Sequence, residues 1–154
     1  MGLTSSIGLG LALARPDLRV IVLDGDGSLL MNLGSLATIG LLRPANLVVV
    51  VMDNQEYATT GGQATPTAHG ADLDAAARAM GISATATVRT DDELRAALAD
   101  VARPFQGREG PLFIVAKVKE STPTRKPPLD CVFIKQRFMS AIHSPQSSIE
   151  GGAL

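Results

Sequence analysis

Two short runs of branched apolar residues, each followed at once by a small polar cluster, constrain the fold of this chain most. The first run covers residues 20–23 and ends in the cluster DGDGS of residues 24–28. The second run covers residues 47–52 and ends in the cluster DNQE of residues 53–56. Continuous apolar runs of this length are typical of parallel strands that are buried on both faces.

The segment between the two runs predicts how they are connected. Residues 29–42 are apolar around most of a helical surface, which indicates a helix buried in a core or in a subunit interface. A strand, a helix and a strand in this order predict a right-handed crossover and a parallel pair of strands. Both polar clusters then lie at the carboxyl edge of one sheet, where open α/β sheets bind ligands.

The remaining chain continues the alternation of helices and strands. We predict a helix from a cap at Ser5 or Ser6 through Ala14, a helix over 72–80 capped by Asp72, a helix from a cap at Thr90 to Ala102, and strands over 84–88 and 112–118. This order predicts an α/β fold, a three-layer doubly wound parallel sheet. The predicted domain covers residues 1–120. Residues 121–143 are expected to form an extension that packs on it, with a short amphipathic helix over 132–142, and residues 144–154 a disordered tail.

Composition excludes several classes of protein. The net charge is −1 and aromatic residues make up only 3%, which disfavours nucleic-acid binding. A single cysteine, Cys131, forms no internal disulfide and favours a cytoplasmic location. No run reaches the roughly 18 apolar residues that a membrane span needs. Residues 1–16 resemble a signal-peptide core and match a myristoylation pattern at Gly2 and Ser6, but a Gly-rich buried helix is the favoured interpretation.

The two polar clusters contain oxygen ligands suited to magnesium. Mg²⁺ binds through one or two carboxylates and keeps ligand phosphates and water in its shell. Asp26 supplies a carboxylate and Asn54 supplies a side-chain carbonyl. The turn after Asn54 can also direct a backbone carbonyl at the same ion, and that of Glu56 is the best placed.

The first cluster also suits a phosphate group. Gly25 and Gly27 allow close approach of the backbone, and a helix that begins near Ser28 offers free N–H groups. The Walker pattern is absent, which disfavours an ordinary NTPase. The alternative for this cluster alone is a tight turn. The Asn-containing turn 28 positions after Asp26, and the helix between two buried strands, together favour a magnesium and diphosphate site.

The motif GDG with Ser28, followed by Asp53-Asn54, resembles the cofactor motif of thiamine diphosphate enzymes, in the PP-type domain that binds the cofactor's diphosphate and magnesium. The resemblance implies magnesium ligands at Asp26, Asn54 and the Glu56 carbonyl. It also implies that the cofactor lies against Gly25, Asp26, Gly27, Ser28, Asn54, Glu56 and Tyr57. The family usually has asparagine at the position of Asp53, a departure that leaves the ligand itself in place.

The resemblance also gives Met1 a role. In the family, a bulky apolar side chain well before the motif aspartate holds the cofactor in its bent form, and Met1 lies 25 positions before Asp26. Such a residue normally follows an earlier strand, so we expect that the sequence is truncated or begins at an internal methionine. The alternative is that Met1 is only the initiator and another residue supports the cofactor.

The resemblance extends from residue 1 to about residue 80 and looks most like 2-oxoacid decarboxylases that act on sulfopyruvate or phosphonopyruvate. Its most discriminating part is TTGGQ, residues 59–63, within a polar loop over 57–70. A loop of this length is usually functional. Candidate ligands for the anionic group of a substrate are Thr59, Thr60, Gln63 and His69, although His69 also fits an exposed loop residue.

By the same resemblance, activation of the cofactor requires a glutamate from a pyrimidine-binding-type subunit or domain. The glutamates here, Glu56, Glu93, Glu109, Glu120 and Glu150, all lie in or after the diphosphate-binding region. We therefore expect a carboxy-lyase subunit of a hetero-oligomer that is inactive alone. The alternatives are a subunit of another thiamine diphosphate enzyme, acetolactate synthase-like or indolepyruvate-type, and a non-catalytic fragment that binds the cofactor without turnover.

Overall fold

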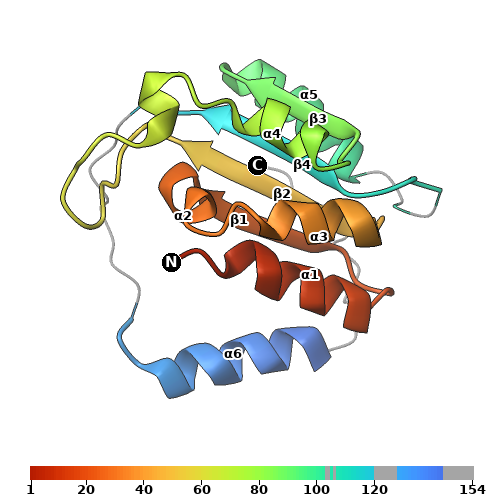
Figure 1. The fold of residues 1–154 in the computed structure, drawn as a ribbon. Coiled ribbons are helices and arrows are strands. Elements are labelled where there is room, and N and C mark those ends of the chain that lie inside the picture. The colour runs from red at the N-terminus through yellow and green to blue at the C-terminus, as the bar shows by residue number, and fades with distance from the viewer. Residues whose placement is uncertain (103–104, 106, 120–127, 144–154) are drawn as a thin grey trace. The chain divides into compact units, whose positions relative to one another are not determined.

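The computed structural model describes residues 1–102, 105, 107–119 and 128–143. The chain divides into two compact units, Met1–Glu120 and Ser121–Leu154. The described part of the first unit contains a parallel sheet with strand order β1-β2-β4-β3 (Figure 1). Its strands are β1 (Val20–Gly25), β2 (Leu47–Asp53), β3 (Ala84–Val88) and β4 (Leu112–Lys117). The predicted α/β parallel sheet is confirmed.

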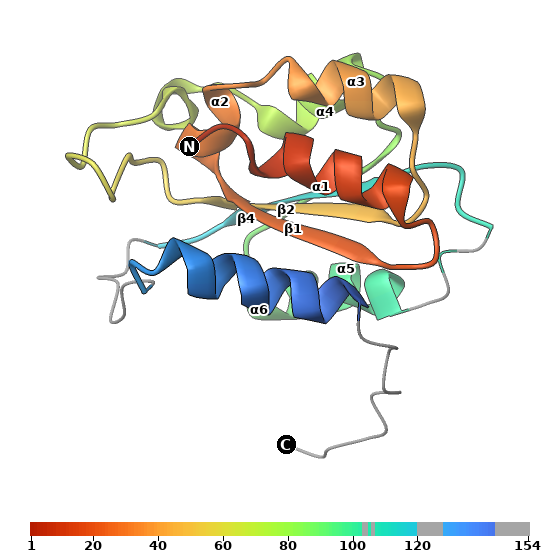
Figure 2. The same cartoon turned by 90° about the horizontal axis from the view of Figure 1, so that it is seen from below.

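Helices cover both faces of this sheet. The helices of the first unit are α1 (Thr4–Ala14), α2 (Asp26–Leu30), α3 (Ser35–Leu42), the 3₁₀ helix η1 (Pro66–His69), α4 (Leu73–Ala79) and α5 (Asp91–Ala102). Figure 2 shows α1 to α4 on one face and α5 on the other. This is the three-layer arrangement that the alternation of helices and strands predicts.

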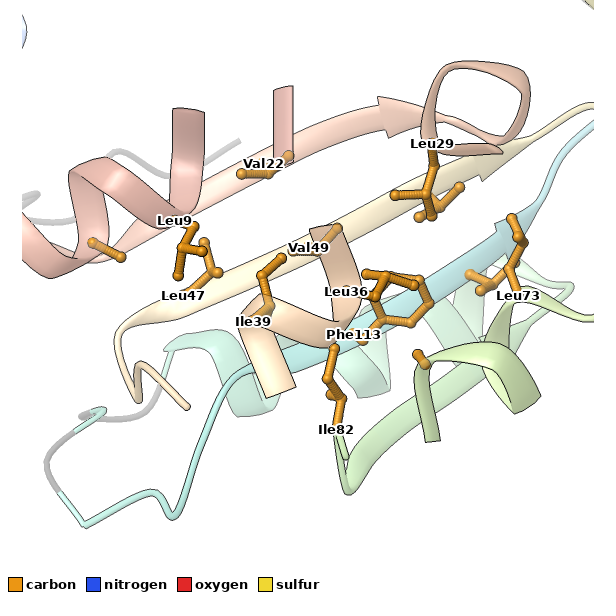
Figure 3. Packing of buried hydrophobic residues seen from close by; sticks show 14 of the residues in the cluster. Leu9, Val22, Leu29, Leu36, Ile39, Leu47, Val49, Leu73, Ile82 and Phe113 are labelled. Atoms are coloured by element: carbon orange, nitrogen blue, oxygen red, sulfur yellow. The ribbon is translucent and has the colours of Figure 1, made fainter. Parts of the chain in front are cut away.

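The core is divided between the two faces of the sheet. Val49 and Val51 of β2 belong to the cluster under α1, α3 and α4, which is shown in Figure 3. Val48 and Val50 belong to a second cluster, which also contains Val101 of α5. Because neighbouring residues of a strand point to opposite faces, a strand covered on both sides needs apolar residues at successive positions. Burial of both faces of β2 therefore explains its continuous apolar run.

The prediction of a single helix over residues 29–42 is wrong. Helix α2 ends at Leu30 and α3 begins at Ser35, and the turn between them contains tight i to i+3 bonds, such as Ser35 N to the Asn32 carbonyl at 3.0 Å. The Asn32 amide donates to Ser6 Oγ of α1 at 3.2 Å, so this side chain serves a contact between helices. Asparagine disfavours a helix interior because its side chain competes for such bonds.

Helix α1 begins without the predicted cap. Its N-cap residue is Leu3, and no side chain caps the helix. Ser5 lies inside the first turn, is buried, and donates to Asp24 Oδ2 at 3.2 Å. The apolar environment between α1 and β1 favours this pairing, since a buried hydroxyl and carboxylate both need a partner.

The predicted caps of α4 and α5 are confirmed. Asp72 accepts bonds from the Asp74 and Ala75 amides at 3.0 Å each. Thr90 Oγ1 accepts from Glu93 N at 3.2 Å, and Glu93 Oε2 accepts from Thr90 N at 3.2 Å. This reciprocal pair is a capping box, which satisfies two free amides of α5.

The described part of the second unit is one helix, α6 (Cys131–His143). Asp130 Oδ1 accepts a bond from Phe133 N at 2.9 Å near its start, and the helix predicted over 132–142 is confirmed. The predicted disordered tail over 144–154 lies outside the described residues. None of the helices in the described ranges has both the length and the apolar character needed to cross a bilayer.

Two glycines in helices should respond oppositely to alanine. A Cβ at Gly40 of α3 would collide with the Met80 carbonyl oxygen, whereas one at Gly10 of α1 would meet no atom within 4 Å. We expect Gly40→Ala to lower the free energy of unfolding by about 1–3 kcal/mol through overpacking. Gly10→Ala should raise it by about 0.5–1 kcal/mol, because alanine costs less conformational entropy in a helix. Urea unfolding of both variants measures this, and equal effects would contradict the close packing of α3.

Candidate functional site

The two polar clusters lie side by side at the carboxyl edge of the sheet. β1 and β2 are parallel neighbours, with Asp24 opposite Val51 and Gly25 opposite Met52. Residues 24–28 and 53–56 therefore emerge from adjacent strand ends, as the sequence predicts.

Asp26 is a buried acid at this edge of the sheet. It is the first residue of α2 and only 1% exposed. Thr65 Oγ1 donates to its Oδ2 at 2.6 Å, and Thr67 Oγ1 lies within hydrogen-bond distance of the same oxygen, at 3.0 Å. No residue in the described ranges donates to Oδ1. One oxygen of this carboxylate is thus held by the protein, and the other remains available to a ligand such as a magnesium ion.

The second cluster forms a tight turn after β2. Asn54 Oδ1 accepts from Glu56 N at 3.2 Å, which closes an Asx turn. Gln55 has a φ of 65°, a left-handed conformation that is uncommon outside glycine. Asn54 Oδ1 has a second lone pair, so this bond leaves it able to ligate a cation.

The Glu56 carbonyl is also available. Glu56 pairs with Ala64 in an isolated antiparallel bridge. The bonds of this bridge are made by its neighbours, Tyr57 N to the Gln63 carbonyl at 2.8 Å and Thr65 N to the Gln55 carbonyl at 2.9 Å. Within the described part of the chain, no donor occupies the Glu56 carbonyl. Asp26, Asn54 and Glu56 together offer the hard oxygens that magnesium prefers, so the residues fit the implied ion.

The two glycines of the first cluster have different functions. A Cβ at Gly25 would meet no atom within 4 Å, so its open side suits the approach of a diphosphate. A Cβ at Gly27 would collide with the Tyr57 ring and would lie 3.1 Å from Thr65 Cγ2. Gly27 is therefore needed to admit Tyr57, and its predicted contact with a phosphate stays a prediction.

The N-terminal segment packs against this turn. Gly2 N donates to Ser28 Oγ at 3.0 Å, so Ser28 is used to fix the segment before α1. The helix expected to begin near Ser28 begins at Asp26 and has only five residues. Met1 is 61% exposed beside this contact, and its role at the cofactor stays a prediction.

The predicted substrate residues lie on the surface of the loop. Thr59, Thr60, Gln63 and His69 are all exposed. The Thr60 hydroxyl donates to the Tyr57 carbonyl at 3.2 Å, within its own turn. In the described structure no hydrogen bond joins these four residues to Asp26 or Asn54, and their role stays a prediction.

A buried network joins residues that the sequence pattern does not indicate. The single proton of the Thr67 hydroxyl is shared between Asp53 Oδ1 at 2.8 Å and Asp26 Oδ2 at 3.0 Å. Asp53 Oδ2 forms an ion pair with Lys117, the last residue of β4, which lies opposite Asp53 in the sheet register. The Asp53 side chain is fully buried, so Lys117 balances a charge that is removed from water. Thr65, Thr67 and Lys117 therefore form one network with Asp26 and Asp53 at this edge of the sheet.

Arg15 and Asp17 form an exposed ion pair in which both groups have altered pKa values. The pKa of Asp17 is lowered because Arg15 donates a hydrogen bond to its carboxylate, and the same bond raises the pKa of Arg15. This exposed pair precedes β1, at the amino edge of the sheet.

Comparison with known proteins agrees with this geometry. The family model described as "Thiamine pyrophosphate enzyme, C-terminal TPP binding domain" matches residues 1–116. TPP, thiamine pyrophosphate, is thiamine diphosphate.

Two curated relatives cover most of this chain. It is 42% identical over 149 residues to sulfopyruvate decarboxylase subunit beta of Methanocaldococcus jannaschii, a match that covers 92% of this chain and 73% of that one. It is 37% identical over 147 residues to phosphonopyruvate decarboxylase of Streptomyces viridochromogenes, which covers 94% of this chain and 36% of that protein. The chain thus spans about a third of the length of the second relative.

A solved structure shares the fold. The 2-oxoglutarate:ferredoxin oxidoreductase from Magnetococcus marinus superposes with a TM-score of 0.62 at 20% identity, covering 88% of this chain and 50% of that one. The sheet order, the paired turns at its carboxyl edge and the family match lead to one conclusion. This chain belongs to the thiamine pyrophosphate enzyme family, as its C-terminal TPP-binding domain.

Proposed function

We propose that this chain is the cofactor-binding subunit of a thiamine diphosphate-dependent decarboxylase of a three-carbon anionic 2-oxoacid. The reaction is the conversion of sulfopyruvate to sulfoacetaldehyde and CO₂, or of phosphonopyruvate to phosphonoacetaldehyde and CO₂. The similarity to decarboxylases named for both substrates supports this reaction class. The observation that carries the proposal is the available Oδ1 of buried Asp26, next to the Asn54 turn at the same sheet edge.

The site residues divide the binding of the cofactor between them. Asp26, Asn54 and the Glu56 carbonyl would hold Mg²⁺, which in turn binds the diphosphate, and Gly25 leaves room for the diphosphate to approach. Bound thiamine diphosphate supplies an electron sink for the loss of CO₂ from a 2-oxoacid. Tyr57 packs against Gly27 and so fixes the turn that carries Asp26.

The exposed loop offers groups for the acidic end of the substrate. A sulfonate or phosphonate is bound by N–H, hydroxyl and cationic donors. Thr59, Gln63 and His69 would supply these groups from the loop surface. Since the Thr60 hydroxyl is used within its own turn, it contributes less.

The activating glutamate is expected from a partner subunit or domain of the pyrimidine-binding type. Among the described glutamates, Glu93 caps α5, and Glu56 belongs to the turn of residues 53–56 that follows β2. Glu109 is exposed, and its carbonyl accepts a bond from Arg43 Nε at 3.2 Å. At these positions, none of the three glutamates is suited to activate the cofactor at its pyrimidine end. The name of the first relative, a beta subunit, supports a hetero-oligomer, and the exposed free thiol of Cys131 favours the reducing cytoplasm.

Decarboxylation assays with and without a partner test this function. We expect CO₂ release from sulfopyruvate or phosphonopyruvate, dependent on Mg²⁺ and thiamine diphosphate, when this chain is co-expressed with a subunit of the pyrimidine-binding type. The chain alone should show no turnover.

The alternatives predict other results in the same assay. Acetolactate formation from pyruvate would favour an acetolactate synthase-like enzyme, and CoA-dependent oxidation of indolepyruvate an indolepyruvate-type enzyme. Cofactor binding without turnover of any 2-oxoacid in the complex would favour a non-catalytic fragment.

A further inference from the structure

The hydroxyls of two buried threonines contact the carboxylate of Asp26. Thr65 is 0% exposed and Thr67 is 4% exposed, and both hydroxyls contact the same oxygen, Oδ2. Their own oxygens are 2.9 Å apart, so Thr65, Thr67 and Asp26 form a closed group. A carboxylate has free rotation about its terminal bond unless it is held. The proton of Thr65 and the proton that Thr67 shares with Asp53 restrict that rotation and leave Oδ1 as the free ligand.

Thr67 also connects Asp26 to the neighbouring strand end. Its hydroxyl contacts Oδ2 of Asp26 at 3.0 Å and Oδ1 of Asp53 at 2.8 Å. Asp53 immediately precedes Asn54, the second expected ligand, and its Oδ1 accepts from Gln55 N at 3.2 Å. One hydroxyl thus fixes the separation of the two turns that carry the ligands.

Residues 65–67 also form hydrogen bonds with the turn of residues 53–56 through their backbone. Thr65 N donates to the Gln55 carbonyl at 2.9 Å, and Gln55 Nε2 donates to the Thr67 carbonyl at 3.2 Å. Gln55 is the residue with left-handed backbone angles, a conformation that persists only where surrounding contacts determine it. Residues 65–67 therefore contact both ligand-bearing turns, through side chains and through backbone.

We propose that Thr65 and Thr67 are positioning residues, whose hydroxyls hold Asp26 as a one-oxygen ligand and set its place relative to the Asn54 turn. The inference rests on the proposed magnesium site. Hydrogen-bonding partners of ligands orient them, and their loss typically costs about 10- to 100-fold in metal affinity. Neither threonine ligates the ion itself.

A titration of the full chain with Mn²⁺ in place of Mg²⁺, followed by electron paramagnetic resonance of the free ion, tests this role. We expect Thr65→Val and Thr67→Val to weaken Mn²⁺ binding by about 10- to 100-fold. Thr67→Ser keeps the hydroxyl and should bind within a few-fold of the parent. The matched control is Thr87→Val, since Thr87 is exposed on β3 and valine suits a strand. Thermal unfolding of each apo variant verifies the fold.

Equal Mn²⁺ affinity in the parent and in both valine variants would overturn the proposal, as would a parent that does not bind Mn²⁺. Thr67→Ser binding as weakly as Thr67→Val would overturn it too, because packing rather than the hydroxyl would then be responsible. If Thr67→Val does not fold, Thr65→Val decides, since it keeps the bond from Thr67 to Asp53. Repeating the titration with thiamine diphosphate separates the positioning role of the threonines from the proposed function of the chain. A parent that binds Mn²⁺ but not the cofactor contradicts the proposed function, while the valine and serine variants still decide this one.

Discussion

Replacing Asp26 by asparagine should reduce magnesium-dependent binding of thiamine diphosphate by more than about 100-fold, beyond the loss typical of residues that only orient a ligand. The change removes the charge of the one carboxylate that the site offers to the ion. Asparagine retains a side-chain oxygen that can accept from Thr65 and Thr67, so the buried group keeps its hydrogen bonds. Isothermal titration calorimetry of the full chain with the cofactor, at fixed Mg²⁺, measures the effect.

The control for this experiment is Asp92→Asn. Asp92 is an exposed acid in the first turn of α5, so its removal changes the net charge equally without touching the site. We expect parental cofactor affinity for Asp92→Asn, and an unfolding midpoint of apo Asp26→Asn close to that of the parent. Unchanged binding in Asp26→Asn would refute the assignment of the metal site.

The proximity of the two expected ligands, Asp26 and Asn54, was predictable because each follows a strand in the chain itself. The apolar runs before Asp24 and Asp53 indicate buried parallel strands, and parallel neighbours end at one edge. Local order along the chain was therefore enough to bring Asp26 and Asn54 to the same place. Asp72 and Thr90 were predictable as caps for the same reason, since a cap bonds to amides two or three residues away.

The roles of Thr65, Thr67 and Lys117 were not predictable, because they arise from contacts between residues far apart in the sequence. Thr65 and Thr67 reach Asp26 across 39 and 41 positions, and in the sequence they are two threonines of a polar loop. Lys117 reaches Asp53 because β4 is the neighbour of β2, although β3 lies between them in the chain. The break between α2 and α3 is of the same kind, since Asn32 bonds to Ser6 on another helix. Tertiary contacts outweigh periodicity at each of these positions.

Lys117→Met should lower the free energy of unfolding by about 3 kcal/mol, at the lower end of the range for breaking a buried ion pair. The Asp53 side chain is fully buried, so without the ammonium its charge stays in the protein interior, where Thr67 and Gln55 N are its remaining partners among the described residues. The Lys117 side chain is 25% exposed, and this partial solvation keeps the loss from being larger. Urea unfolding, monitored by far-ultraviolet circular dichroism, measures the change.

The double variant Asp53→Asn with Lys117→Met separates lost charge balance from lost packing. Asparagine is the residue that the family resemblance places at position 53, and a neutral amide needs no counter-charge. We therefore expect the double variant to recover most of the stability that Lys117→Met loses, whereas Lys119→Met, at an exposed lysine two residues further, should have almost no effect. If the double variant is as unstable as Lys117→Met, then the loss of stability does not come from an unbalanced charge on Asp53. Recovery would instead mean that an aspartate at this position is tolerated only because β4 ends in a lysine, which ties the charge of residue 53 to that of residue 117.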